Sequence, residues 1–227
     1  MTSEIQPLSL GFVNCYLVKV SEGFVLVDTG IRSKRDILEK VFMSAGCKPG
    51  NLKLIVITHG DIDHSGNAAY LRDKFRTKIA MHRNDSVMVE EGKMVSKRRV
   101  KSRFLRMMHI VMRLSGGMKK MIAEFESFKP DIFLEEGQGL QEFGFDAKIL
   151  HVPGHTKGSI AILAENGDLI VGDTLQNRNG PHPAGIIEDE AELSSSLKRL
   201  SNLNIKSVYP GHGNPFKWEQ FAATQTG

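Results

Sequence analysis

Four side chains that commonly bind metal ions lie within six residues of one another, at His59, Asp61, Asp63 and His64. They directly follow an apolar, largely β-branched run, Leu54 to Thr58, which predicts a buried strand. A loop at the end of a strand allows such side chains to converge. Neutral imidazole and carboxylate oxygen together suit zinc, iron or manganese, so this segment predicts a metal site.

Three further ligand-type residues occur later in the chain, at His155, Asp173 and His212. Each follows a short apolar run and has a glycine directly before it. Glycine lets the backbone turn sharply and approach a ligand closely. Because one loop cannot surround a metal ion alone, we expect the loops that carry these seven residues to meet.

The order of the seven ligands resembles the metallo-β-lactamase superfamily, a hydrolase-rich group that includes glyoxalase II and the lactonases. Further segments look like the opening hairpin and the later metal loops of that family: Asn14 to Leu17, Leu26 to Gly30, Pro153 to Ser159 and Pro210 to Gly213. The resemblance covers nearly the whole chain. It implies an α+β fold, a four-layer αββα sandwich, with all seven ligands on loops along one edge.

The resemblance also implies two divalent metal ions and a division of the ligands between them. His59, Asp61 and His155 would bind one ion, Asp63, His64 and His212 the other, and Asp173 would bridge. Two cations held about 3.5–4 Å apart can share a hydroxide that attacks the substrate. In this scheme Asp63 has a second, catalytic role in holding or moving the proton. Asp28 is expected to orient one of the ligand histidines.

Asp61 departs from the family pattern, which usually has histidine at this position, although flavodiiron proteins also carry a carboxylate there. Three carboxylates and one hydroxide balance the charge of two divalent cations, whereas a histidine would leave one positive charge. A less positive centre with more oxygen ligands should favour iron or manganese over zinc. An alternative is that Asp61 only forms hydrogen bonds and a single metal ion binds in the other pocket.

Hydrolysis of an ester, thioester, lactone or lactam is the function that these residues favour. Gln176 stands where lactonases of the family often have tyrosine, three residues beyond Asp173, which argues against an acyl-homoserine lactonase. Two alternatives stay open: an iron-dependent redox protein, suggested by Asp61, and a phosphodiesterase or nuclease. We expect a small-molecule substrate, anionic or apolar, rather than a nucleic acid.

The composition agrees with a single enzyme domain over residues 1–227, since 41% of the residues are hydrophobic and 25% are charged. The N-terminal residues do not resemble a secretion signal, and no apolar run approaches the roughly 18 residues that span a bilayer. We therefore expect a cytoplasmic protein in which Cys15 and Cys47 are reduced and structural. The sequence leaves a homo-oligomer open.

A basic helical insert is predicted at about residues 86–128. Residues 93–120 contain ten Lys or Arg and no Asp or Glu. Apolar residues recur at helical spacing in this segment, and arginines form a second face: Phe104, Met107, Met108, Val111 and Leu114, with Arg99, Arg103, Arg106 and Arg113. Three interpretations remain open: a surface helix whose apolar stripe packs on the domain, a lid hinged at Gly116 and Gly117, or a contact with a membrane surface or partner.

The elements that must position the ligands follow the same apolar patterns. Strands are expected at 12–20, 24–27, 54–58, 78–81, 131–134, 147–152, 159–164, 168–171 and 207–209. Helices are expected at 34–45, 67–75 and 189–203, and near Trp218. Four histidines outside the ligand set carry weaker signals: His82, His109, His151 and His182. Of these, only His82 and His182 are candidates for the mouth of the site.

Overall fold

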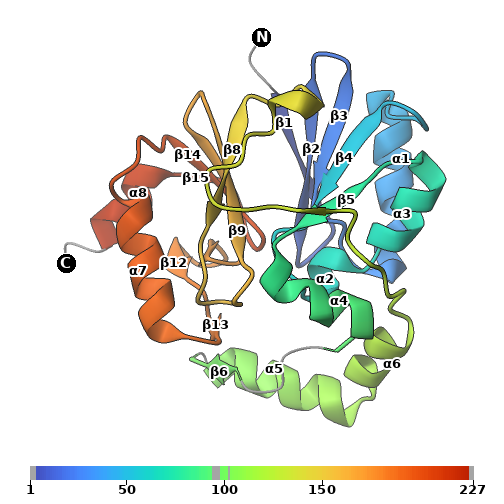
Figure 1. The fold of residues 1–227 in the computed structure, drawn as a ribbon. Helices are drawn as coiled ribbons and strands as arrows, with labels where there is room; N and C mark the ends of the chain where they lie inside the picture. Colours follow the sequence, from blue (N-terminus) through green and yellow to red (C-terminus); the bar gives the residue numbers. More distant parts are fainter. Residues whose placement is uncertain (1–3, 94–97, 102, 225–227) are drawn as a thin grey trace.

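The computed structural model describes residues 4–93, 98–101 and 103–224. Two β-sheets pack face to face, and helices cover the outer face of each sheet (Figure 1). The central strands are buried on both faces, which requires a layer on either side of each sheet. The predicted α+β architecture, a four-layer αββα sandwich, is therefore confirmed.

The first sheet has six strands in the order β1-β2-β3-β4-β5-β7. Their bounds are β1 Glu4–Ser9, β2 Asn14–Val20, β3 Gly23–Val27, β4 Leu52–Val56, β5 Ile79–Met81 and β7 Ile132–Phe133. β1, β2 and β3 form an antiparallel meander, and β3, β4, β5 and β7 are parallel. The sequence did not reveal β1, an exposed edge strand that contains Pro7. An edge strand tolerates proline because one side of its backbone needs no ladder partner.

The second sheet has five strands in the order β15-β14-β10-β9-β8. Their bounds are β8 Ala147–His151, β9 Ile160–Ala164, β10 Asp168–Gly172, β14 Ser207–Pro210 and β15 Phe216–Lys217. Two small two-stranded sheets lie outside it: β11 (Leu175–Gln176) with β12 (His182–Pro183), and β6 (Arg99–Val100) with β13 (Ile186–Ile187).

The two sheets bury alternate side chains against each other and against the helices. Val25 and Val27 of β3 belong to the core between the sheets, together with Ile162 of β9. Leu26 of β3 points the other way and packs with Phe42 in the core beneath the helices. This period of two places one face of each strand in each core.

Two longer helices and several short ones complete the layers. On the first sheet, α1 (Arg35–Ala45) and α3 (Ala68–Phe75) supply buried apolar residues, and on the second sheet α7 (Glu190–Leu200) and α8 (Trp218–Thr224) do so. Short helical segments lie in the connections: η1 Arg32–Lys34, α2 Ile62–Ser65, η2 Arg83–Asp85, α4 Ser86–Glu91 and η3 Gln141–Phe143. No helix within the described residues is long and apolar enough to cross a membrane.

The basic insert differs from the single amphipathic helix predicted for it. Arg99 belongs to β6, so the prediction that it lies on a helical arginine face is wrong. Two helices follow, α5 (Arg103–Leu114) and α6 (Gly117–Ala123), and Gly116 separates them in a left-handed conformation with φ 72°. The predictions for residues 94–97 and 102, and for the side chains of Arg103, Phe104, Met108 and His109, lie outside the described residues.

The apolar stripe of α5 does not pack on the domain at the positions that can be described. Met107, Val111 and Leu114 are 64%, 57% and 84% exposed. The interpretation of a stripe packed on the domain is therefore wrong for these three residues. Figure 1 shows α5 and α6 running across one end of the molecule, away from both sheets.

Candidate metal centre

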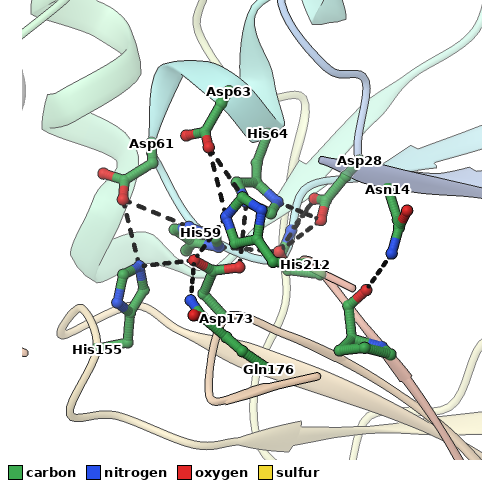
Figure 2. Close-up of polar contacts among 12 residues, drawn as sticks. Asn14, Asp28, His59, Asp61, Asp63, His64, His155, Asp173, Gln176 and His212 are labelled. Atoms are coloured by element: carbon green, nitrogen blue, oxygen red, sulfur yellow. Dashed lines mark hydrogen bonds and ion pairs between the residues drawn. The ribbon is translucent and has the colours of Figure 1, made fainter. Parts of the chain in front are cut away.

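The seven predicted ligands lie on loops or a short helix that follow four strands. His59 follows β4, and Asp61, Asp63 and His64 occupy or precede α2 directly after it. The others are His155 after β8, Asp173 after β10 and His212 after β14. Figure 2 shows all seven side chains pointing toward one another from these segments.

One group of ligand atoms is formed by Asp63, His64 and His212, which lie within 4.8 Å of one another. The Oδ2 atom of Asp63 is 3.6 Å from Nε2 of His212 and 3.9 Å from Nε2 of His64. Both histidines are buried, whereas 22% of the Asp63 side chain is exposed. This group matches the set that the resemblance implied for one of the two ions.

The second group consists of His59, His155 and Asp173, all buried and again within 4.8 Å of one another. Asp61 lies beside this group, with its Oδ2 atom 3.2 Å from Nε2 of His155 and 3.5 Å from Nε2 of His59. Asp61 thus approaches the two histidines with which it was expected to share an ion.

Asp173 lies between the two groups. Its Oδ2 atom is 3.1 Å from Nε2 of His212 and 3.9 Å from Nε2 of His155, and its Oδ1 atom is 3.3 Å from Nε2 of His64. Gln176 donates to the same Oδ2 atom at 3.0 Å. A Cβ atom at Gly211 would lie 2.3 Å from Oδ1 of Asp173, so the glycine before His212 is needed for this close approach.

All four ligand histidines use Nδ1 for a contact with an oxygen atom. The partners are Thr58 Oγ1 for His59 (3.0 Å), Asp28 Oδ2 for His64 (2.8 Å), the Ile186 carbonyl for His155 (2.7 Å) and the Phe12 carbonyl for His212. Carbonyl and carboxylate oxygens only accept, so Nδ1 carries the proton in His64 and His155. The Thr58 hydroxyl donates to Asp28, which leaves its oxygen free to accept from His59. Nδ1 of His212 also lies 2.9 Å from Nη2 of Arg178, which only donates. In His59, His64 and His155 the Nε2 lone pair is therefore free to bind a metal ion.

Several buried atoms of this cluster lack a hydrogen bond. Among the described side chains, these include Nε2 of His59, Nε2 of His64, Oδ1 of Asp61 and Oδ1 of Asp173. A buried polar atom left unsatisfied costs roughly 1–3 kcal/mol. Since all four are ligand-type atoms that face the cluster, the donor set fits divalent cations.

The charges of the cluster also bear on metal binding. Burial would raise the pKa of Asp173, but His212 and His64 lower it to well below its usual range. Burial lowers the pKa of His64, but Asp28, Asp173 and Asp63 raise it well above the ordinary value. A metal ion binds only the unprotonated Nε2 atom, so a cation at His64 competes with a proton.

Asp28 occupies the orienting position that the resemblance implied. It follows β3 with φ 60° and accepts hydrogen bonds from the backbone N–H of Thr58 at 2.8 Å and from the Thr58 hydroxyl. Its other contact is with Nδ1 of His64, at 2.8 Å. One carboxylate therefore fixes His64 directly and His59 through Thr58.

Asp85 was missed by the sequence analysis. It is buried and accepts from the backbone N–H of Gly60 at 2.9 Å and of Gly158 at 2.7 Å. These glycines belong to the loops that carry His59 and His155, so Asp85 joins two loops that come from different sheets. The available signal was its place shortly after a strand, where the predicted carboxylates also lie.

Arg98 was also missed, because it was counted only as part of the basic segment. Its Nη1 atom lies 2.5 Å from Oδ2 of Asp61. Its side chain is 6% exposed, so the guanidinium is buried against the metal cluster.

The histidines outside the ligand set do not join either group of ligands within the described residues. His82 and His151 stack on each other, with ring centroids 4.0 Å apart and an angle of 8° between the rings. Nδ1 of His182 contacts the Pro183 carbonyl at 2.7 Å.

Comparison with known proteins agrees with this geometry. The model of the metallo-beta-lactamase superfamily matches residues 8–212. The hydroxyacylglutathione hydrolase GloC of Haemophilus influenzae is 29% identical over 94% of this chain and 92% of its own length. The acyl-coenzyme A thioesterase MBLAC2 of Bos taurus is 25% identical over 91% of this chain and 75% of its own length.

Among solved structures, TTHA1623 in a di-iron-bound form superposes with a TM-score of 0.68 and 27% identity, over 97% of this chain and 98% of its own. The family model spans most of the chain and includes all seven ligand-type residues. The chain belongs to the metallo-β-lactamase superfamily and is a hydrolase of that fold.

Proposed function

We propose that this hydrolase cleaves an acyl bond of a small molecule, an ester, thioester or lactone, with two divalent metal ions bound by the seven-residue cluster. The observation that carries the proposal is the position of Asp173, whose two oxygens face ligand histidines of both groups. A carboxylate in this position can bridge two cations, which is the arrangement that two-metal hydrolysis requires.

In this proposal His59, Asp61 and His155 bind the first ion, and Asp63, His64 and His212 bind the second. When bound, the two cations would lower the pKa of water and polarise the bond to be cleaved. The residues behind the ligands keep the four imidazoles oriented, so little reorganisation accompanies the reaction.

Asp63 is the ligand best suited to exchange a proton with solvent. Its side chain is 22% exposed, whereas those of Asp61 and Asp173 are 8% and 6% exposed. Asp63 therefore serves both as a ligand and as the group that holds and passes the proton.

Thioesters are the first substrate class to test. Two relatives carry names that refer to thioester substrates, hydroxyacylglutathione and acyl-coenzyme A. Both thiol carriers are anionic, and acyl chains are apolar. The exposed part of α5 offers groups of both kinds, since Arg106 and Arg113 accompany Met107, Val111 and Leu114.

The metal ions are zinc, iron or manganese in this proposal. The di-iron form of TTHA1623 supports iron as one candidate. The cytoplasmic location and a homo-oligomer stay predictions.

A substrate panel tests the function directly. Protein loaded with zinc, iron or manganese is assayed against acyl-glutathione and acyl-coenzyme A thioesters, aryl esters, lactones and a phosphodiester reporter. We expect thioester hydrolysis that His155→Ala and Asp63→Ala abolish. His151→Ala is the matched control, because His151 stacks on His82 outside the cluster and should retain activity.

Other outcomes would overturn the proposal. Hydrolysis that is unchanged in His155→Ala and Asp63→Ala would refute the metal mechanism. Cleavage confined to the phosphodiester would favour the nuclease alternative, and oxygen consumption by iron-loaded protein without hydrolysis would favour the redox alternative.

A further inference from the structure

The side chain of Arg98 turns inward just before β6. Arg99 is its neighbour in sequence, and the side chain of Arg99 is 74% exposed and pairs with Glu190 on the surface. By contrast, the side chain of Arg98 is 6% exposed and its Nη1 atom donates to Oδ2 of Asp61. A buried guanidinium is strongly unfavourable unless an anion pairs with it.

Arg98 and Asp61 form a buried ion pair. The Nη1 atom of Arg98 lies 2.5 Å from Oδ2 of Asp61, and the two side chains are 6% and 8% exposed. A guanidinium keeps its positive charge in proteins, so it needs an anion at this short distance.

The backbone that follows Arg98 is hydrogen-bonded to a strand next to His155. β6 pairs with β13, with Val100 opposite Ile186, and the N–H of Lys101 donates to the Gly185 carbonyl at 2.9 Å. The Ile186 carbonyl accepts from Nδ1 of His155 at 2.7 Å. The start of the basic insert is therefore linked to two ligand-type residues, to Asp61 through Arg98 and to His155 through the pairing of β6 with β13.

This contact bears on the residue that departs from the family pattern. With histidine at position 61, the cluster would hold two carboxylates, Asp63 and Asp173. With Asp61 it holds three, and Arg98 supplies one positive charge. The protein groups carry the same net charge with Asp61 and Arg98 as with histidine at position 61 and no arginine. Arg98 therefore cancels the charge that Asp61 adds.

We propose that Arg98 is a positioning residue that makes aspartate tolerable at position 61: its guanidinium cancels the added charge and holds the carboxylate toward His59 and His155. In this way the segment around β6, at the start of the basic insert, becomes part of the metal centre. The inference rests on the metal centre proposed above. With Arg98 counted, a centre with Asp61 carries the same charge as one with histidine at this position and no arginine, and the preference for iron or manganese stays a prediction.

A double-mutant cycle tests the pair, with Asp61→His, Arg98→Met and Asp61→His/Arg98→Met. The readouts are bound metal per chain after dialysis, measured by elemental analysis, and the unfolding midpoint in the presence of a chelator. Neither readout depends on the substrate or on activity. Arg99→Met is the matched control, because this arginine pairs only at the exposed surface.

We expect Asp61→His alone to leave Arg98 buried beside histidines without its anion. The midpoint should fall by roughly 10 °C, and one of the two ions should be lost. The double variant should regain the second ion and most of the midpoint, because it has the neutral ligand without the unpaired cation. Asp61→His/Arg99→Met should behave like Asp61→His.

Three results would overturn the inference. The Asp61→His variant could keep both ions and the wild-type unfolding midpoint, or the double variant could bind no more metal and unfold no later than Asp61→His. In the third, Arg99→Met would restore metal binding and the midpoint of Asp61→His as well as Arg98→Met does. If Asp61→His does not fold, a double variant that is soluble and binds metal still supports the proposed pairing of Arg98 with Asp61. A double variant that also does not fold counts against it. If the wild-type protein binds no metal, the proposed function is wrong. If it binds metal but the effects of Asp61→His and Arg98→Met on metal content and midpoint simply add, only this inference is wrong.

Discussion

The metal centre and the basic insert differ in how fully their side chains are partnered. In the centre, four ligand histidines each have a second contact behind the ring, and Asp28 and Asp85 tie neighbouring loops together. In α5, Met107, Val111 and Leu114 face solvent. A network of this kind fixes a geometry, whereas these three exposed side chains add no packing that would fix the position of α5. Arg98 and β6 connect the two regions.

The largest effect is expected from removing the carboxylate shared by both groups. Asp173→Asn should lower hydrolysis by roughly 10³-fold and reduce the bound metal, because a neutral amide is a poor bridge between cations. Steady-state kinetics and elemental analysis measure the two effects. Asp168→Asn is the control, since Asp168 lies at the other end of β10. Equal loss in both variants would mean that the strand, and not the centre, was damaged.

Removing the support of two metal loops should have the next largest effect. Asp85→Ala leaves the N–H groups of Gly60 and Gly158 without their acceptor, and metal affinity should fall about 10–100-fold. Competition with a chromophoric chelator measures the affinity. Asp131→Ala is matched to it, because Asp131 accepts from the backbone N–H of Ile79 away from the centre. An affinity that stays at the wild-type value in Asp85→Ala would contradict this role.

The contrast in packing predicts different losses of stability for one kind of substitution. Leu54→Ala removes a fully buried side chain between the sheets and should lower the free energy of unfolding by about 2–5 kcal/mol. Leu114→Ala removes a side chain that is 84% exposed and should change it by less than about 0.5 kcal/mol. Urea titration measures both values. A large loss in Leu114→Ala would show that α5 packs on a surface in solution.

The smallest effect concerns the two thiols. Burial raises the pKa of Cys47 to about 12, and burial with Asp28 and Asp63 nearby raises that of Cys15 well above its ordinary value. Both thiols should be protonated and unreactive toward an aromatic disulfide reagent at pH 8, and both should react after denaturation. Since the folded pKa of Cys47 is raised, its contribution to stability is complete below pH 9 and should decline as the pH rises toward 12. Rapid labelling of native protein would contradict the burial.

Much of the fold and of the centre could be predicted because the signals are local. His155, Asp173 and His212 each follow an apolar strand and a glycine, and strand ends that share a sheet edge bring such residues together. Asp28 was expected only through the family resemblance. The structure brings these residues into contact.

Other features depend on contacts that sequence spacing does not encode. Arg98 and Arg99 are adjacent residues of one type, and only the pairing of β6 with β13 decides which of them is buried. Asp85 looks like an ordinary residue at the start of a helix until Gly60 and Gly158 approach it from two sheets. The period of α5 was identified correctly, but periodicity cannot show whether an apolar stripe meets a partner.

Anomalous diffraction from a crystal of metal-loaded protein tests the central claim most directly, with data collected at the absorption edge of the bound metal. We predict two peaks flanking the Asp173 carboxylate, one beside His59 and His155 and the other beside His64 and His212. A single peak, or none at this cluster in a crystal grown with zinc, iron or manganese, would contradict the two-metal centre.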